Sequence, residues 1–434
     1  MRLSFIIPCL LFTASLFSQI TVTEVGELPE AVSNNPVCEG FINGVPYLFS
    51  FGGIDNSKIY SGIHTRSFRY NLETGESEVI PSLPDTRGKV GAGASRIGNR
   101  IYIMGGYYVA ANGTEITSDS VHIYDIENNV FLDNGTPIPV PTDDHVQVVY
   151  RDSLIMLVTG WNTNNNIREV QIYNPDTDSW TQATPTPSPR QYRSFGASGV
   201  IQNDTIFYFG GAAAASGFDI QSYIRKGIIN PQDPSQIEWS ISEPDENIAV
   251  YRAAATLVDN ELHWIGGSAV TYNFDGIAYN GSGGVSPTHW DLYTEDKLGW
   301  SSTGVAELPM DLRGIAEIND TLKYIAGGML DNQEVSNKVY RLEWPLRTTS
   351  LSQVSTSVTF EIYPNPAIDI LHINGSDLIN STAIITNSVG QELKVTNLTE
   401  QVSTIDISDI PLGTLTLTVY HGTNRSSVSF IKTK

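Results

Sequence analysis

The sequence predicts an all-β protein in which one four-stranded unit is repeated and a smaller all-β domain follows. Three observations support this prediction. Pairs of glycines end apolar runs at a regular interval. The 434 residues include 37 glycines and 20 tyrosines, which favour turns and strands. No long stretch shows the apolar periodicity of an amphipathic helix.

The glycine pairs recur from Gly52 to Gly328. They end the segments FSFGG, IYIMGG, IFYFGG, LHWIGG and KYIAGG, at Gly53, Gly106, Gly211, Gly267 and Gly328. A sixth segment, LIMLVTGW, has Thr159–Gly160 in the corresponding place. Successive pairs are separated by about 50 residues, and a period of this length indicates a repeat architecture.

Each repeat follows the same internal plan. A polar turn such as Asn43–Gly44 or Asn203–Asp204 shortly precedes the glycines, and such residues tolerate the positive φ of a tight hairpin. After the glycines come a variable loop, a tyrosine-bearing strand, a second turn and often a tryptophan, as in VQIYNPDTDSW at Val170–Trp180. Each repeat is therefore expected to form four antiparallel strands, one blade of a β-propeller.

These motifs resemble the kelch β-propeller family over residues 19–346, which implies a ring of blades around a central channel. The number of blades and their closure follow from the ends of the repeat region. The sixth repeat stops at YRLEWP without an outer strand, whereas ITVTEVGELPEAVS at the N-terminus has the pattern of an outer strand without a preceding blade. We expect Ile20–Leu28 to supply the missing strand and close a six-bladed ring.

Residues 1–18, MRLSFIIPCLLFTASLFS, are expected to be a secretory signal peptide, with a basic start, an apolar centre and small residues near the cleavage site. Its removal would leave Cys38 as the one cysteine, so the exported protein is expected to have no internal disulfide. No transmembrane segment is predicted in the mature chain.

A second domain is predicted at the C-terminus. Residues 347–357 are rich in Ser and Thr and are expected to be a linker, and residues 358–434 alternate like the strands of a small β-sandwich. This tail resembles the C-terminal sorting domain of the type IX secretion system of Bacteroidetes. The matching features are Tyr363–Pro366 (YPNP), the NSVGQEL hairpin, IDISDIPLG and a lysine-bearing end, whereas Gly413–Leu415 departs from the usual G-x-Y.

The resemblance of the tail implies a route and a location. The protein would cross the inner membrane by its signal peptide and the outer membrane through the type IX machinery, which would recognise residues 358–434. It would then be secreted or held at the outer cell surface. The alternative is an adhesive β-sandwich without an export role. The 47 acidic and 25 basic residues give a net charge of −22, which disfavours nucleic acid and anionic membranes as partners.

Candidate ligand-binding residues precede the inner strands of the repeats. These are four arginines, Arg87, Arg193, Arg252 and Arg313. Arg252 and Arg313 share one offset from the first glycine of their pairs, and His145 has the same offset. Arginine recognises carboxylates and phosphates with a forked geometry, so these side chains are candidates for an anion site at the channel mouth. The alternative is that they bridge neighbouring blades. Asp144 and His145 are weak candidates for acid–base chemistry.

Two functions from different classes remain open at this stage. The first is a binding module that recognises a glycan or a protein at the propeller mouth, with long loops rich in Tyr, Asn and Gly. The second is an enzyme resembling the six-bladed kelch sialic acid mutarotases, in which Arg252, Arg313 and Arg193 would hold the carboxylate of an acidic sugar. The lack of a recognisable catalytic set favours binding over catalysis. The histidine spacing indicates no metal site, and no cofactor is predicted.

Overall fold

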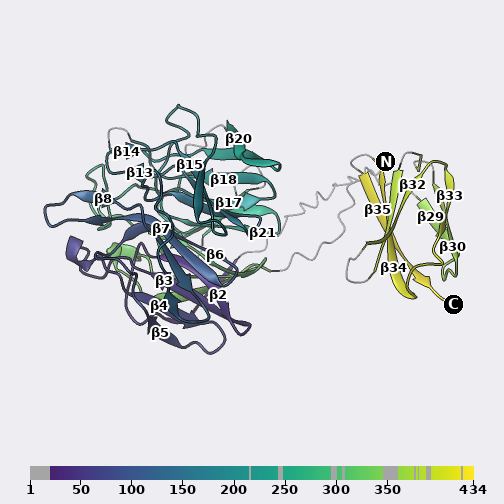
Figure 1. The fold of residues 1–434 in the computed structure, drawn as a ribbon, viewed down its shortest axis with the longest axis horizontal. Helices are drawn as coiled ribbons and strands as arrows, with labels where there is room; N and C mark the ends of the chain where they lie inside the picture. Colours follow the sequence, from purple (N-terminus) through teal and green to yellow (C-terminus); the bar gives the residue numbers. More distant parts are fainter. Residues whose placement is uncertain are drawn as a thin grey trace, which may run out of the picture. The chain divides into compact units, whose positions relative to one another are not determined.

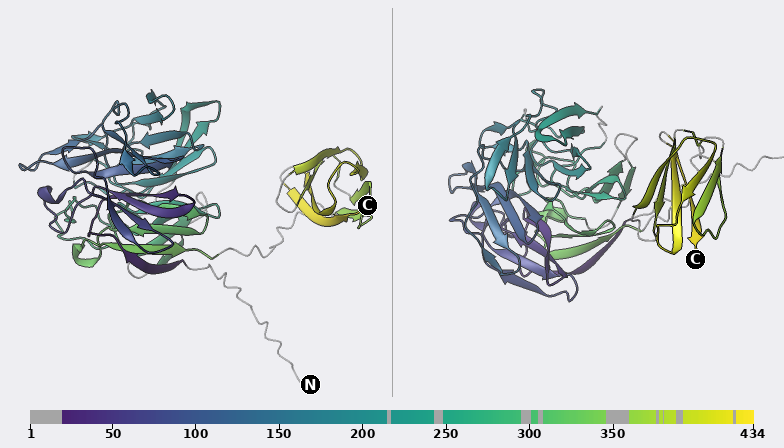
Figure 2. Two further views of the ribbon diagram at one scale, coloured as in Figure 1. Left: turned by 60° about the horizontal axis from the view of Figure 1, so that its bottom comes forward. Right: turned by 45° about the vertical axis from the view of Figure 1, so that its right-hand side comes forward.

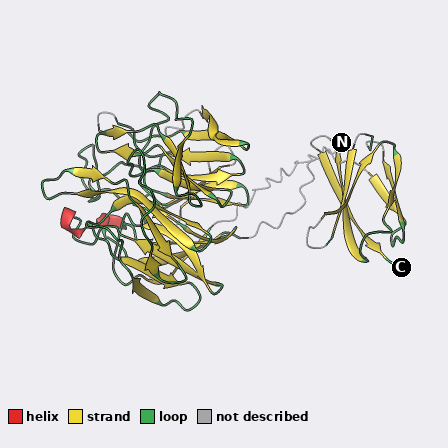
Figure 3. Cartoon of the chain, in the orientation of Figure 1, coloured by secondary structure: helices red, strands yellow, loops and turns green. Residues whose placement is uncertain are grey.

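The computed structural model describes residues 20–214, 217–242, 248–294, 301–304, 308–345, 360–375, 378–379, 381–387, 392–421 and 424–434. The chain divides into two compact units, Met1–Arg347 and Thr348–Lys434. The predicted signal peptide, the predicted linker and residues 388–391 of the predicted NSVGQEL hairpin lie outside the described residues. Strands dominate both units, and the helical segments of the described part are two single turns, η1 (Tyr60–Gly62) and η2 (Asp331–Gln333) (Figure 3).

The first unit is a ring of six antiparallel sheets, the blades, which follow one another in chain order (Figures 1 and 2). In each blade the second strand pairs with the first through a short hairpin, and the third and fourth strands follow outward. From the inner strand outward, blade 1 contains β2 (Pro36–Ile42), β3 (Val45–Phe51), β4 (Ser67–Asn71) and β5 (Ser77–Ile80). Blade 2 contains β6 (Val90–Ile97), β7 (Arg100–Val109), β9 (Val121–Asp125) and β10 (Val130–Phe131). Blade 3 contains β11 (Val146–Tyr150), β12 (Leu154–Val158), β15 (Val170–Asn174) and β16 (Ser179–Gln182).

The remaining blades have the same order, and the predicted six-bladed propeller is thereby confirmed. Blade 4 contains β17 (Ser198–Gln202), β18 (Thr205–Phe209), β19 (Ile224–Asn230) and β20 (Asp233–Ile241). Blade 5 contains β21 (Ala254–Val258), β22 (Glu261–Ile265), β23 (Trp290–Thr294) and β24 (Ser301–Gly304). Blade 6 contains β26 (Ala316–Asn319), β27 (Leu322–Ala326), β28 (Lys338–Glu343) and β1 (Thr21–Glu27). Four short strands lie outside this scheme: β8 (Glu115–Thr117), β13 (Trp161–Asn162), β14 (Asn165–Asn166) and β25 (Arg313–Gly314).

The N-terminal strand closes the ring as the sequence predicts. Strand β1 pairs antiparallel with β28, from Thr21 opposite Glu343 to Glu27 opposite Lys338. In the right-hand view of Figure 2, the last, green blade accordingly lies beside the first, purple one. The Lys338 ammonium also bonds Glu24 (2.8 Å) and Glu27 (2.6 Å) on β1. Closure of this kind removes the two exposed edges that an open blade would leave.

The glycine pairs join each blade to the next one. The N–H of the second glycine donates to a carbonyl just before the next inner strand, as from Gly211 to Val250 (2.8 Å) and from Gly267 to Pro309 (3.1 Å). Both residues of each pair have positive φ, and a Cβ on Gly266 would overlap the Pro309 carbonyl itself. Glycine is required here because the next blade's backbone occupies the place of a side chain.

Apolar cores fill the spaces between neighbouring blades. One core, for example, contains Tyr102 and Met104 of blade 2 with Ile155 and Leu157 of blade 3, and all four side chains are buried. Each of the other blade interfaces has an equivalent cluster. The propeller therefore owes its stability to sheet-on-sheet burial of apolar surface around the ring.

The second unit is a β-sandwich of two antiparallel sheets, as predicted. One sheet contains β29 (Phe360–Tyr363), β30 (Ile370–Gly375) and β33 (Val402–Asp406), and the other β31 (Ser381–Thr386), β32 (Glu392–Leu398), β34 (Gly413–His421) and β35 (Asn424–Lys432). Their inner faces share one core that includes Leu371, Ile385 and Leu417. Near the C-terminus the buried Lys432 ammonium donates to the carbonyls of Ser408 (3.1 Å) and Ile410 (2.7 Å).

Candidate functional site

Six residues at or just before the start of the inner strands all have positive φ. We call them the axial ring: Asn34, Gly91, Asp144, Gly196, Arg252 and Asp311, with φ between 46° and 68°. Backbone hydrogen bonds link these residues from blade to blade, for example from the Arg252 N–H to the Gly196 carbonyl (2.8 Å) and from the Gly196 N–H to the Asp144 carbonyl (2.8 Å). Because these bonds draw the six blades together, the propeller is narrow at this level.

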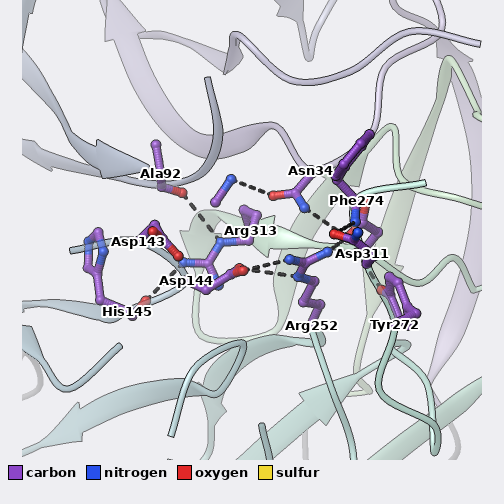
Figure 4. A network of polar contacts seen from close by, with 12 residues as sticks. Asn34, Ala92, Asp143, Asp144, His145, Arg252, Tyr272, Phe274, Asp311 and Arg313 are labelled. Carbon is purple, nitrogen blue, oxygen red and sulfur yellow. Dashed lines mark hydrogen bonds and ion pairs between the residues drawn. The ribbon is translucent and has the colours of Figure 1, made fainter. Parts of the chain in front are cut away.

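Three charged side chains of the axial ring form a buried ionic cluster (Figure 4). The Arg252 guanidinium binds both oxygens of Asp144 (2.6 and 3.2 Å) and one oxygen of Asp311 (3.1 Å). Their side chains are at most 2% exposed. Burial would raise the pKa of Asp144, but Arg252 and Arg313 lower it more. Arg252 therefore links blade 5 to its neighbour, blade 6, and also to blade 3 across the ring.

Arg313 lies beside this cluster and spans the channel. Its Nη2 donates to the His145 carbonyl (2.9 Å), and its Nε lies 3.4 Å from the Ala92 carbonyl on β6 of blade 2. The nearest carboxylate oxygen to Arg313 among the ion pairs of the described residues belongs to Asp144, 3.5 Å from Nη1. Since Asp144 binds Arg252 more closely, it compensates the charge of Arg313 only in part.

Aromatic side chains cover the axial ring on the side of the long loops. Tyr107, Tyr251 and Tyr272 belong to one buried apolar cluster, and the Arg252 guanidinium lies over the rings of Tyr251 (5.0 Å) and Tyr272 (5.4 Å). Burial raises the pKa of all three phenols well above their usual value. Tyr272 comes from a loop expected to display its aromatics for ligand stacking. The structure buries it instead, because the loop packs over the arginine.

A cavity of about 390 Å³ occupies the channel and is lined by the inner strands of all six blades. Arg313 and His145 line it, whereas Arg252, Asp144 and Asp311 do not. Arg313 and His145 are buried, but Asp152 and Glu317, which line the cavity near the hairpins of blades 3 and 6, are exposed. The channel therefore has its floor at Arg313 and opens at the hairpin end.

The walls of the channel combine small residues with a chain of polar groups. The small residues include Gly93, Ala197, Gly199 and Ala253. Within the described residues, five of the inner strands (β6, β11, β17, β21 and β26) pair with no further strand on their channel side. His145 Nε2 lies 3.1 Å from Gln147 Oε1, and the Gln147 amide donates to Ser95 Oγ (3.0 Å). Toward the mouth, Glu39 binds Arg96 (3.0 Å).

The imidazole of His145 is a neutral group with spare hydrogen-bonding capacity. Burial, assisted by the charge of Arg313, lowers its pKa to about 4. Because Gln147 accepts from Nε2, the other nitrogen, Nδ1, is the acceptor of the neutral ring. Nδ1 is buried, the nearby Thr142 backbone favours the protonated ring, and no residue of the described part of the chain forms a hydrogen bond with this nitrogen. The Ser198 hydroxyl, also on the channel wall, is likewise without a partner in the described part of the chain.

The structure brings together four of the six residues that the sequence singled out. Asp144, His145, Arg252 and Arg313 meet at the channel floor. Arg87 is exposed in the loop before β6, with its guanidinium 4.2 Å from the centroid of the Tyr108 ring. Arg193 is half-buried in the turn before β17, where its N–H donates to the Arg190 carbonyl (3.1 Å).

Sequence reasoning missed the remaining polar residues of the site, chiefly Asn34, Gln147 and Asp311. Asn34 and Asp311 share the structural position of Arg252, but both lie further from the glycine pairs of their blades than Arg252 does. A fixed offset therefore does not align them. Their tolerance of positive φ is the signal that could have found them.

The described residues contain no cluster of three or more His, Cys, Asp and Glu side chains that could hold a metal ion. Cys38 is a buried free thiol whose pKa is raised by burial. Within the same described part of the chain, no helix has the length and apolar character needed to cross a membrane.

Comparison with known proteins identifies both units. The family model of the KLHDC2/KLHL20/DRC7 Kelch-repeats domain matches residues 42–267, and that of the secretion system C-terminal sorting domain matches residues 361–433. Beta-scruin of Limulus polyphemus is 21% identical over 343 residues, which cover 75% of this chain and 36% of that protein. Kelch-like protein terF of Aspergillus terreus is 26% identical over 211 residues, or 47% of this chain and 42% of that protein. The chain thus spans less than half the length of these relatives.

Two further matches cover most of the related protein. N-acetylneuraminate epimerase 1 of Escherichia coli O6:H1 is 23% identical over 355 residues, which cover 68% of this chain and 88% of that protein. The solved structure titled "Structure of YjhT" superposes with a TM-score of 0.57 at 14% identity, over 72% of this chain and 95% of that one. The chain belongs to the kelch-repeat family, and it carries a C-terminal sorting domain that directs it through type IX secretion to the cell surface or the medium.

Proposed function

We propose that this exported propeller binds an acidic sugar in its central channel. The observation that carries the proposal is the position of Arg313 on the floor of the cavity, where its nearest carboxylate contact is a long one to Asp144. A ligand carboxylate would complete the neutralisation of this guanidinium in a site shielded from water. Arg252, held by two carboxylates behind the floor, would keep Asp144 turned away from the ligand.

The distribution of charge along the channel suits a polyhydroxylated acid. The floor offers a cation and the neutral imidazole of His145, while the mouth offers the carboxylates of Glu39, Asp152 and Glu317. A sugar acid that enters with its carboxylate toward Arg313 places its hydroxyl groups beside these acceptors and beside the open strand edges. A cavity of about 390 Å³ is at the small end of the range for ligand sites, which suits one sugar unit rather than a long chain.

A second candidate function is the interconversion of the anomers of such a sugar. It is favoured by the position of His145 on the cavity wall and by the similarity to N-acetylneuraminate epimerase 1. The imidazole would take the proton of the anomeric hydroxyl while a water molecule at the mouth protonates the ring oxygen. The bond between the anomeric carbon and the ring oxygen would break to give an open-chain carbonyl, and reclosure on the other face would return both protons.

The test is a calorimetric titration of the mature chain with N-acetylneuraminate and glucuronate, and with glucose as the uncharged control. We expect binding of an acid that weakens by about tenfold or more in Arg313→Lys, because lysine keeps the charge but loses the fork. Arg151→Gln, which changes an exposed arginine on the hairpin of blade 3, is the matched control. Equal affinity for glucose, or an unchanged affinity in Arg313→Lys, would contradict the proposal and direct attention to protein partners.

The enzymatic candidate needs a separate readout. Exchange between anomer signals in NMR spectra should be faster with the protein than in buffer, and His145→Gln should abolish the acceleration while leaving binding within a few-fold. Exchange at the spontaneous rate would leave the channel as a binding site without catalysis.

A further inference from the structure

A second hollow lies at the opposite end of blades 1 and 2 from the channel mouth. It has a volume of about 540 Å³ and is formed by the β3–β4 loop with η1, the β5–β6 loop and the end of β7. These connections are at the far end of the strands from the inner hairpins, so this groove and the channel face opposite sides of the ring. We define the groove by Tyr60, His64, Arg66, Arg87 and Tyr108.

Arg87 supplies the groove with an uncompensated positive charge. Its guanidinium carbon lies over the Tyr108 ring, 4.2 Å from the centroid, and the guanidinium forms no ion pair with the described residues. The nearby Asp85 carboxylate is engaged by the Lys89 ammonium (3.0 Å). Arg66 differs from Arg87, because it binds Glu30 (2.7 Å). An arginine stacked on an aromatic ring is held in place and keeps its donor edge free for a carboxylate.

His64 supplies polar atoms that lack protein partners. The residue is 7% exposed, and neither of its ring nitrogens has a hydrogen-bond partner in the described part of the chain. Burial and the charge of Arg66 lower the pKa of His64 to about 4, so the ring is neutral and offers one donor and one acceptor. Buried polar groups without partners are costly, so His64 would gain from a ligand hydroxyl that reached its ring from the groove.

We propose that this groove is a second ligand site, which binds a carboxylated sugar residue of an acidic glycan. Arg87 takes the carboxylate, the 45%-exposed ring of Tyr60 packs on the apolar face of the sugar, and His64 bonds its hydroxyls. A hydroxylated ring with a carboxylate meets all three requirements at once. Loops and η1 form most of the groove, which favours a compact ring over a peptide that pairs with a strand edge. The site shares no residue with the channel.

The experiment is a calorimetric titration of the mature chain with glucuronate and with an oligogalacturonate, and with glucose as the uncharged control. We expect Arg87→Gln to weaken the groove interaction by about tenfold or more, as for loss of a charge-assisted hydrogen bond. Arg100→Gln, which removes an exposed arginine from the hairpin end of the same blade, should leave it unchanged. His64→Leu should weaken binding of glucuronate and the oligogalacturonate alike.

The design separates this site from the channel. If both sites bind glucuronate, the wild type takes up two equivalents, and Arg87→Gln and Arg313→Lys each remove a different one. If only the groove binds, Arg87→Gln abolishes all binding and Arg313→Lys none. Equal effects of Arg87→Gln and Arg100→Gln would overturn the proposal. So would displacement of the glucuronate by a Glu-rich peptide that binds more tightly, since that result would assign the groove to a protein partner.

Discussion

Arg252 shows how much of the centre of this propeller depends on one side chain. It sits in a left-handed backbone conformation and neutralises carboxylates from two other blades. Burial alone would lower its pKa, yet Asp144 and its other neighbours raise it well above the usual value, so the guanidinium stays charged. A buried ion pair is weak evidence of net stabilisation, but the loss of one partner leaves the other charge buried and unpaired.

We therefore predict that Arg252→Met lowers the free energy of unfolding by about 3–5 kcal/mol. Adding Asp144→Asn and Asp311→Asn should restore part of that loss, because the triple variant no longer buries two carboxylates without their shared guanidinium. The recovery is incomplete because Arg313 loses its ion pair with Asp144. Denaturant titration of the three proteins measures both effects. A triple variant that is less stable than Arg252→Met would show that the carboxylates have other essential partners.

A second prediction concerns the pH dependence of stability through His145. Its pKa is about 4 in the folded protein against 6.5 for the free side chain. Between these values only the unfolded chain binds the proton. The contribution of His145 to the free energy of unfolding is therefore fully present above pH 6.5 and is lost as the pH drops toward 4. Protonation of His145 alone should lower the free energy of unfolding by about 3 kcal/mol over this pH range.

His145→Gln should flatten the stability curve in that range by about 1.4 kcal/mol per pH unit. Urea titrations of both proteins from pH 7 to pH 4 measure the slope. The lowered pKa of His64 acts in the same direction, so a residual slope is expected in the variant. Identical slopes in the two proteins would contradict the assignment of a neutral, buried imidazole.

At the level of individual residues, the sequence predicted part of the site. Arg252, Arg313 and His145, which share one offset in the sequence, lie near the floor of the channel. That offset did not separate the arginine that lines the cavity from the one sealed behind it, because that difference arises from Asp311 and from the aromatic cover. Both come from loops whose lengths vary between repeats, so neither follows from periodicity.

The glycine pair is the element that most clearly connects sequence to architecture. The period of the pair in the sequence predicted the blades. The physical role of the pair is visible only in the structure, where it packs against the backbone of the next blade. The first glycine clears the space and the second donates the hydrogen bond. Thr159 shows that the first position tolerates a side chain in blade 3, where it takes φ of 52° and bonds the Ile167 carbonyl (2.9 Å).

We predict that Gly266→Ala is far more destabilising than Gly44→Ala. Both glycines have positive φ, but a Cβ at Gly266 would overlap the Pro309 carbonyl, while at Gly44 nothing lies within 4 Å. The backbone strain common to both should cost about 1 kcal/mol, and the overlap should add about 2 kcal/mol. Thermal unfolding of the two variants gives the comparison. Equal losses would mean that φ alone explains the glycines.

For the whole molecule, the two compact units lead to a prediction about export and stability. A chain that ends at residue 346 should keep the unfolding midpoint of the propeller, because the apolar core of each unit consists of its own residues. The same truncation should leave the protein inside the outer membrane, since it removes the sorting domain at 361–433. Calorimetry and cell fractionation measure the two effects. A lower midpoint for the truncated propeller would show that the tail supports its folding.

The pairing of β1 with β28 has a consequence for the life of the secreted protein. Thr21 stands opposite Glu343, so the earliest and latest residues of the propeller complete the same sheet. A chain that stops early, or that loses its first few residues to a protease, leaves blade 6 without one of its strands and exposes a sheet edge. The closure thus acts as a test of completeness, because only an intact chain can hide its last edge.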